Sequence, residues 1–339
     1  MPADMHALAE DLAAESGVLR NMVADLDDDG WHTPTPAEGW NISDQISHLS
    51  FFDDAAIQSA TDPEGFAAEM ERAFTVGELT PDDVAERYRN QSGAELLGWF
   101  DASRRRLINV FSELDPAVRL PWFGLPMSAA SSLTARIMET WAHGQDVADA
   151  LGEVREPTAR LRHIVHIGVR AMPFSFAANG IDLPPDPVRV ELASPDARLW
   201  SWGPEHAANR VTGPALDFCL VVTQRRHRYD TALRTQGDVA SQWLAIAQAF
   251  AGPPGTGRKP AHQALVVVGG PAQLFGLRAP LFVGEPPFPG RASWLCRPPW
   301  GWRRRGSLGE QLGQPSCRRF PVAELRPVLR RGHRDHAAD

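Results

Sequence analysis

The stretch SAASSLTARIMETWAHGQDVADALG, residues 128–152, carries the clearest structural signal in the chain. Ser128 suits an N-cap, and Gly152 suits the position after a helix where glycine is favoured. Between them, apolar residues recur every three or four positions, at Leu133, Ile137, Trp141, Gly144, Val147 and Leu151. This spacing is typical of a helix with one side against a core. We therefore expect one long helix over 128–151.

A second side of this expected helix is polar, with Arg136, Glu139, His143 and Asp146 three or four residues apart. Because residues i and i+4 lie one turn apart on the same face, Glu139 and His143 can reach a single metal ion. The same pair also suits a solvated helix face, or a salt bridge with Arg136 or Asp146. Gly144 is costly in mid-helix and usually marks the close approach of another backbone.

His48 is the third candidate ligand, and it lies on an earlier expected helix. Asn41 suits the N-cap of that helix, with Asp44 in the third position of a capping box. A lone histidine there is often a hydrogen-bonded core residue, because a buried imidazole needs a partner. If the two helices face each other, His48 joins Glu139 and His143 in a three-ligand site with an open position. That arrangement is typical of a catalytic zinc.

Further helix signals predict a bundle. Apolar spacing predicts a helix from Met5 to about Asp27, and Thr80 followed by Pro81 begins another that we expect to reach Leu114. With the helices that begin near Asn41 and Ser128, these make four long antiparallel helices. The first part of the chain is therefore predicted to be a four-helix bundle.

The character of the sequence changes after Pro157, where one more helix leads to short alternating segments. Residues 188–194 and 198–203 read as a hairpin, and 209–213 and 231–237 as further strands. Apolar segments 214–225 and 238–250 predict two helices that cover one face of the sheet. The fold class is therefore α plus α+β, with a helical domain at 1–153, an α+β domain at 154–255 and a separate segment at 256–339.

The last 80 residues differ in composition from the rest of the chain. Residues 260–339 hold 12 arginines, no lysine and five acids, so this segment carries +7 while the remaining 259 residues carry −15 of the net charge of −8. The segment also has no sustained period of 2 or 3.6. It is either a disordered basic tail or an extension produced by a reading-frame shift, and we assign it no function.

Composition excludes several functional classes. Residues 1–259 carry a net charge of −15 and offer no clustered positive charge of the kind that binds nucleic acid. No apolar run approaches the roughly 18 residues of a membrane span. The absence of a signal sequence favours a cytoplasmic protein. Three cysteines, with no CxxC pair, predict neither a disulfide framework nor a thiolate metal site. We expect a small-molecule enzyme that is a monomer or a homodimer.

Two motifs together resemble a known family. EGWNISDQISHLSFFD (38–53) and ETWAHGQDVADALG (139–152) are similar to the DinB-like superfamily, specifically the mycothiol-dependent maleylpyruvate isomerase type. The resemblance covers residues 5 to about 255 and implies that His48, Glu139 and His143 are metal ligands. It also implies a sterol-carrier-like second domain, in which Arg225 contributes to the active site, with Arg226 as the other choice.

The resemblance implies thiol chemistry on a divalent metal, most simply zinc, with nickel as another occupant. A thiol such as mycothiol would attack an electrophilic carbon, to give isomerisation or conjugation. Arg225 would pair with a substrate carboxylate, while Asp146 would hold His143 through its second ring nitrogen or remain a surface acid. Two alternatives stay open. One is hydrolysis with Asp146 or Asp44 as the base, and the other is a binding module without catalysis.

Overall fold

The computed structural model of the protein describes residues 3–76 and 80–261, with side chains for all of these except 74–76. The helices are α1 (Met5–Val23), α2 (Asp28–Trp31), α3 (Ile42–Thr61), α4 (Pro63–Val76), α5 (Pro81–Tyr88), α6 (Gly93–Ser112), α7 (Ala129–Leu151), α8 (Leu161–Arg170), α9 (Met172–Ala178), α10 (Ala215–Val222) and α11 (Asp238–Ile246). The strands are β1 (Arg119–Leu120), β2 (Met127–Ser128), β3 (Val188–Ala193), β4 (Leu199–Trp202), β5 (Asn209–Pro214) and β6 (Arg234–Gln236), and a short 3-10 turn spans Arg228–Asp230. The predictions for the basic segment fall, from residue 262 on, outside the described residues.

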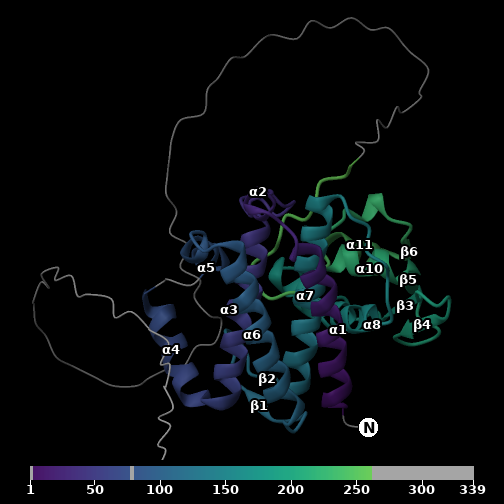
Figure 1. The fold of residues 1–339 in the computed structure, drawn as a ribbon. Helices are drawn as coiled ribbons and strands as arrows, with labels where there is room; N and C mark the ends of the chain where they lie inside the picture. The colour runs from purple at the N-terminus through teal and green to yellow at the C-terminus, as the bar shows by residue number, and fades with distance from the viewer. Residues whose placement is uncertain (1–2, 77–79, 262–339) are drawn as a thin grey trace, which may run out of the picture. The chain divides into compact units, whose positions relative to one another are not determined.

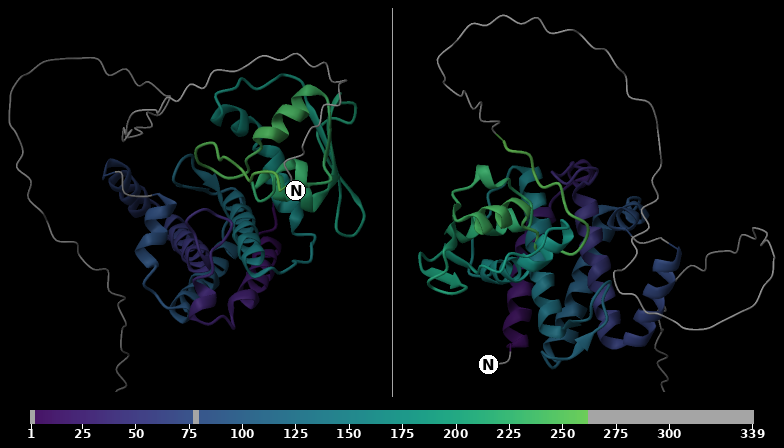
Figure 2. Two further views of the ribbon diagram at one scale, coloured as in Figure 1. Left: turned by 90° about the horizontal axis from the view of Figure 1, so that it is seen from above. Right: turned by 180° about the vertical axis from the view of Figure 1, so that it is seen from behind.

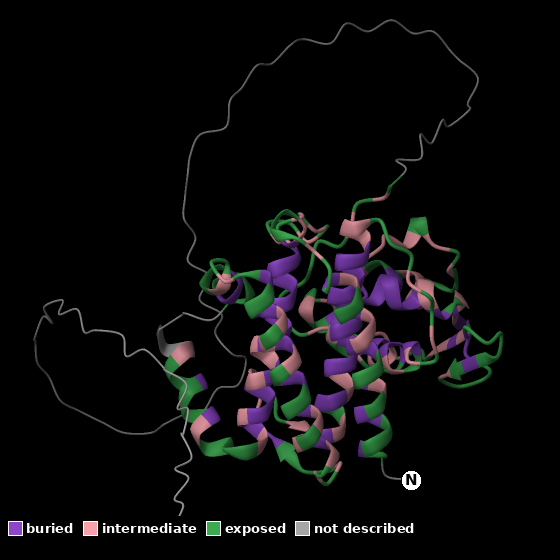
Figure 3. Ribbon diagram, viewed as in Figure 1, coloured by how far each residue is buried: buried purple, intermediate pink, exposed green. Residues whose placement is uncertain are grey.

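Four long helices, α1, α3, α6 and α7, form the bundle that the sequence predicts (Figure 1). Helix α3 packs against α6 and α7, and α1 packs against the same two helices. Buried residues line the inner sides of these helices, and exposed residues lie on the outside (Figure 3). The predicted caps are confirmed: Asn41 and Asp44 form a capping box, Ser128 caps α7, and Gly152 ends α7 in the left-handed conformation.

The expected single helix from Thr80 to Leu114 is wrong. Helix α5 ends at Tyr88, and α6 begins at Gly93. The break arises because Ser92 and Glu95 form a capping box: the Ser92 side chain accepts a hydrogen bond from the Glu95 backbone, and the Glu95 carboxylate accepts one from the Ser92 backbone. Gly93 is needed there, since a Cβ would collide with the Trp31 indole. Helix α4 was also not predicted.

A buried ion cluster joins all four helices of the bundle. Asp53 on α3 is fully buried and accepts hydrogen bonds from Arg104 of α6 at 2.7 Å and Arg136 of α7 at 2.9 Å. Arg104 also donates to Ser16 of α1 and Thr140 of α7, both at 2.8 Å. Because a buried charge is tolerated only when it is paired, this cluster fixes how α3 and α7 face each other.

The second part of the chain is a four-stranded sheet in the order β4-β3-β5-β6. Strands β3 and β4 pair antiparallel, as the predicted hairpin requires, β3 pairs parallel with β5, and β5 pairs antiparallel with β6. Helices α10 and α11 both contact β5. The sheet and its helices lie beside the bundle (Figure 2). The predicted fold class, α plus α+β, is confirmed.

One continuous hydrophobic core joins the two parts. It contains Trp141 of α7, Leu161 of α8 and Val190 of β3, all of them buried. The described residues, 3–76 and 80–261, accordingly belong to one compact unit. The boundaries at 153 and 255 stay predictions. Among the helices in residues 3–76 and 80–261, none combines the length and apolar content needed to cross a bilayer.

Replacing Asp53 with alanine tests the buried cluster. The Asp53→Ala variant should lose about 3–5 kcal/mol of unfolding free energy, because it leaves two buried guanidinium groups without their shared partner. Its neighbour Asp54 is a matched control. Asp54 is part-exposed and bonds to Trp99 and Arg106, so Asp54→Ala should cost about 1 kcal/mol. Urea unfolding measures both, and equal losses would contradict the role of the cluster.

Candidate metal centre

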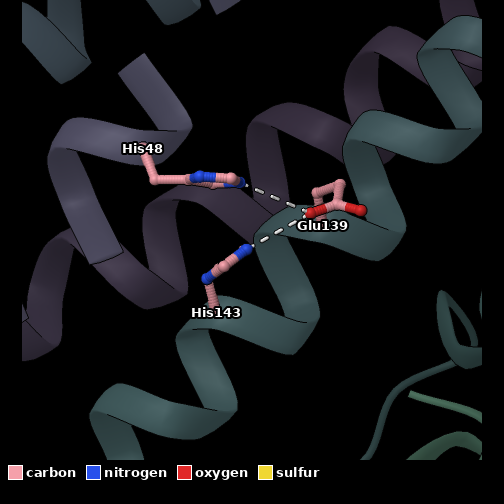
Figure 4. Close-up of side chains that lie close together, drawn as sticks. All are labelled: His48, Glu139 and His143. Atoms are coloured by element: carbon pink, nitrogen blue, oxygen red, sulfur yellow. Dashed lines mark hydrogen bonds and ion pairs between the residues drawn. The ribbon is translucent and has the colours of Figure 1, made fainter. Parts of the chain in front are cut away.

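The fold brings together the three ligands that the sequence predicts. His48 Nε2 lies 3.9 Å from Glu139 Oε2, and His143 Nε2 lies 3.2 Å from the same oxygen. One donor atom from each residue lies within 4.8 Å of the other two. Figure 4 shows His48 on α3 directed toward Glu139 and His143 on the facing helix α7. Helix periodicity places Glu139 and His143 on one face, and the packing of α3 on α7 adds His48.

This donor set fits a divalent metal ion. Two imidazoles and one carboxylate are ordinary zinc ligands, and bonds of about 2.1 Å in tetrahedral geometry separate donor atoms by roughly 3.4 Å. The two distances to Glu139 Oε2 fall on either side of this value. Within the described part of the chain, the group holds three such residues. A tetrahedral ion would therefore keep one position for another ligand.

Burial and the contacts among the side chains set the charges of His48 and Glu139. Burial, and then the neighbouring His143, lower the pKa of His48 to about 4. Burial would raise the pKa of Glu139, but its interactions with His143 and His48 outweigh this and hold that pKa well below its usual range. At neutral pH His48 is therefore neutral and Glu139 is ionised. These are the states that a metal ion requires of its ligands.

Aromatic rings hold His48 in place. The His48 ring lies 4.6 Å from the Phe52 ring and 5.3 Å from the Trp40 ring, which also stacks at 6.0 Å over His143. Nδ1 of His48 is buried and has no hydrogen-bond partner within residues 3–76 and 80–261. Packing thus positions this imidazole. Neither Trp40 nor Phe52 was predicted to be a site residue, although Phe52 lies four residues after His48.

Gln45, and not Asp146, contacts the second ring nitrogen of His143. Gln45 Oε1 lies 2.5 Å from His143 Nδ1, so the expectation that Asp146 holds this nitrogen is wrong. The expectation of a surface acid is also wrong, because Asp146 is only 1% exposed. The signal for Gln45 was its position three residues before His48, which places it on the same face of α3.

Asp146 instead anchors two arginines from the second part of the chain. Its Oδ2 accepts hydrogen bonds from Arg225 Nε at 3.2 Å and Nη2 at 2.8 Å, and its Oδ1 accepts one from Arg258 Nη2 at 2.7 Å. Arg226 makes the equivalent two-pronged pair with Asp149, one turn further along α7. Arg225 therefore contacts α7 three residues after His143, and Arg226 contacts it one turn farther along the helix.

Two other expectations for α7 are corrected. Arg136 does not pair with Glu139; it bonds to Asp53 and to the Leu49 carbonyl. At Gly144 no backbone approaches closely, and the nearest neighbour of a Cβ there would be the Arg155 guanidinium, at 3.4 Å. On the polar stripe of α7, Arg136, His143 and Asp146 are buried and Glu139 is half-buried, and all four have polar partners in the fold. This excludes a solvated helix face as the explanation of Glu139 and His143.

Comparisons with known proteins agree with this geometry. The family model described as the mycothiol maleylpyruvate isomerase N-terminal domain matches residues 12–148, which include all three candidate ligands. Two uncharacterized proteins of Mycobacterium tuberculosis are each 49% identical over 256 residues, 76% of this chain and 100% of the relative. Residues 12–148 therefore belong to the mycothiol maleylpyruvate isomerase N-terminal domain family. Family membership supports an enzyme of mycothiol-related chemistry.

Similarity to solved structures is weaker. Crystal structures of the mycothiol-dependent maleylpyruvate isomerase and of a histidine-to-alanine mutant of it align with a TM-score of 0.47 at 14% and 15% identity. Each alignment covers 69% of this chain and 93% of the other. A model described as wyosine base formation matches residues 184–236, which hold the four-stranded sheet. The predicted sterol-carrier likeness of this part stays a prediction.

Metal analysis tests the three-ligand centre. The full-length protein loaded with zinc and then dialysed should retain one equivalent, whereas His48→Ala and His143→Ala should each retain none, because two ligands hold zinc too weakly. His163→Ala is the matched control, since His163 is a histidine of α8 that bonds to Asp11. Retention of one equivalent by both site variants would refute the centre.

The stability of the metal-free protein should depend on His48. His48 takes up a proton near pH 6.5 in the unfolded chain but only near pH 4 in the folded chain. The contribution of neutral His48 to the unfolding free energy is therefore fully present above about pH 6.5 and is lost as the pH falls toward 4. The loss should be on the order of 3 kcal/mol. Urea unfolding of wild type and His48→Gln, with metal removed, measures it. An equal loss in both proteins would exclude His48 as the cause.

Proposed function

We propose that the protein is a metal-dependent enzyme that uses mycothiol or a similar low-molecular-weight thiol. It acts as an isomerase or S-transferase on a small electrophilic substrate that carries a carboxylate. The observation that carries the proposal is the set of two buried histidines, His48 and His143, and the half-buried Glu139 between α3 and α7, in a family whose model names mycothiol. The metal would be zinc, with nickel as the other occupant of such a nitrogen and oxygen site.

The chain supplies the site and its electrostatics. His48, Glu139 and His143 would hold the metal, which when bound retains positive charge and lowers the pKa of a thiol beside it. Trp40 and Phe52 exclude water from one side of His48 by covering its ring. A thiolate is the more reactive form of a thiol, so the nucleophile is available near neutral pH.

Arg225 is the residue that would bind the substrate carboxylate. Its Nε and Nη2 donate to Asp146, and its Nη1 donates to the Thr223 carbonyl at 2.8 Å. A guanidinium has five N–H bonds, so two remain beyond these contacts, one on each terminal nitrogen. Two such bonds suffice for a bidentate carboxylate pair. In this proposal Asp146 positions Arg225 and does not touch the substrate.

The reaction begins when the thiolate sulfur attacks the electrophilic carbon of the substrate and forms a C–S bond. For a substrate with a conjugated double bond, this addition turns one double bond into a single bond, about which the substrate can rotate. Loss of the thiolate then restores the double bond and gives the isomer, with the thiol regenerated. If the sulfur stays, the product is a conjugate.

The two alternatives have less support. Hydrolysis needs a free carboxylate as base, but Asp146 holds two arginines, and Asp44 holds Arg89 and caps α3. A non-catalytic metal module would place a fourth protein ligand on the ion, and among the described residues the cluster holds three. Activity without added thiol would favour hydrolysis. A cobalt spectrum that thiol does not alter would favour the module.

Thiol-dependent turnover tests the proposal. Zinc-loaded protein should convert maleylpyruvate or a related electrophilic carboxylate only when mycothiol is present, and His48→Ala should lose this activity. Arg225→Lys should raise KM for the carboxylate about tenfold, because lysine cannot form the bidentate pair. Arg226→Lys is the matched control and should leave KM unchanged. A higher KM in Arg226→Lys alone would assign the substrate contact to Arg226 instead.

A further inference from the structure

The contact between Gln45 and His143 belongs to a chain of hydrogen bonds with a fixed direction. Thr35 Oγ1 lies 3.0 Å from the Trp40 carbonyl, which can only accept, so the hydroxyl donates to it. The Gln45 amide nitrogen therefore donates to Thr35 Oγ1, at 2.9 Å. This leaves the amide oxygen of Gln45 toward His143, at 2.5 Å from Nδ1. His143 Nδ1 must then be the donor.

The direction of the chain decides where the lone pair of His143 points. When Nδ1 carries the single ring proton, the lone pair of Nε2 faces Glu139 Oε2, 3.2 Å away. Two acceptors that face each other repel unless a positive charge lies between them. A metal ion held by His143 and Glu139 would remove this repulsion, and the Nδ1–H tautomer offers Nε2 in the form that binds a metal.

We propose that Gln45 is the positioning residue of the metal centre, and that it selects the metal-binding tautomer of His143 and fixes its ring. Gln45 is fully buried, so water does not compete for this contact. His48 has no comparable partner in the described residues, since its Nδ1 is unpaired and rings hold it instead. The protein therefore controls the proton of one of its two imidazole ligands, through Gln45. The inference rests on the metal site of the proposed function.

Zinc affinity of the full-length protein tests the inference. Gln45→Leu keeps the approximate size of the side chain and removes the acceptor, so zinc should bind about 10–100-fold more weakly. Gln45→Glu restores an acceptor at Nδ1 and should keep the affinity within a few-fold of wild type. Gln145→Leu is the matched control, because Gln145 lies two residues from His143 and bonds to Asp149. It should bind zinc as wild type does.

A spectroscopic readout separates positioning from folding. Nitrogen-15 spectra of histidine-labelled, metal-free protein should show His143 as the Nδ1–H form in wild type and lose that form in Gln45→Leu, with unchanged circular dichroism. Folded Gln45→Leu that binds zinc as wild type does would overturn the inference. A wild type that binds no zinc would overturn the metal site as well. Weakened zinc binding in Gln45→Leu, with no thiol transfer by any variant, would support Gln45 and refute only the proposed reaction.

Discussion

The shared burial of Asp53 between Arg104 and Arg136 is the constraint on which the site depends. A carboxylate with no exposed surface must be paired, and Asp53 is paired with Arg104 of α6 and Arg136 of α7. Arg104 also donates hydrogen bonds to side chains of α1 and α7. Arg136 is three residues before Glu139, and Asp53 is five residues after His48. The cluster that fixes the register of α3 against α7 therefore also fixes which side chains meet one turn away.

Along α7, the polar residues Arg136, Glu139, His143 and Asp146 have different partners. Arg136 serves the ion cluster, Glu139 and His143 form the donor set with His48, and Asp146 holds Arg225 and Arg258. Asp53 and His48 both lie on α3, whereas Arg225 and Arg258 lie in the second part of the chain, so α7 joins the bundle to that part. A helix that reads as amphipathic in sequence is in fact buried on both sides. For this reason the arginine proposed to bind substrate lies near the metal centre.

Much of the fold follows from local signals. Capping residues located the starts of α3, α5 and α7 and the end of α7, because caps satisfy backbone groups within a few residues of one another. The same logic failed between Tyr88 and Gly93, where a second capping box divides one expected helix in two. Helix periodicity paired Glu139 with His143, the expected helix that begins near Asn41 offered His48 as the third ligand, and the family motif supported all three. Neither signal identified Gln45 as the partner of His143, since that contact joins residues 98 positions apart.

The sequence by itself determined most of the long helices, the strands of the four-stranded sheet, the fold class and the three candidate ligands, because each rests on spacing or on a short motif. Only the tertiary structure decided what lies behind those ligands. In the tertiary structure Asp146 pairs with two arginines, Gln45 contacts His143, and Asp53 pairs with Arg104 inside the bundle. The physical reason is that a buried polar group must find a partner wherever the packing provides one. That partner depends on how helices distant in sequence come together.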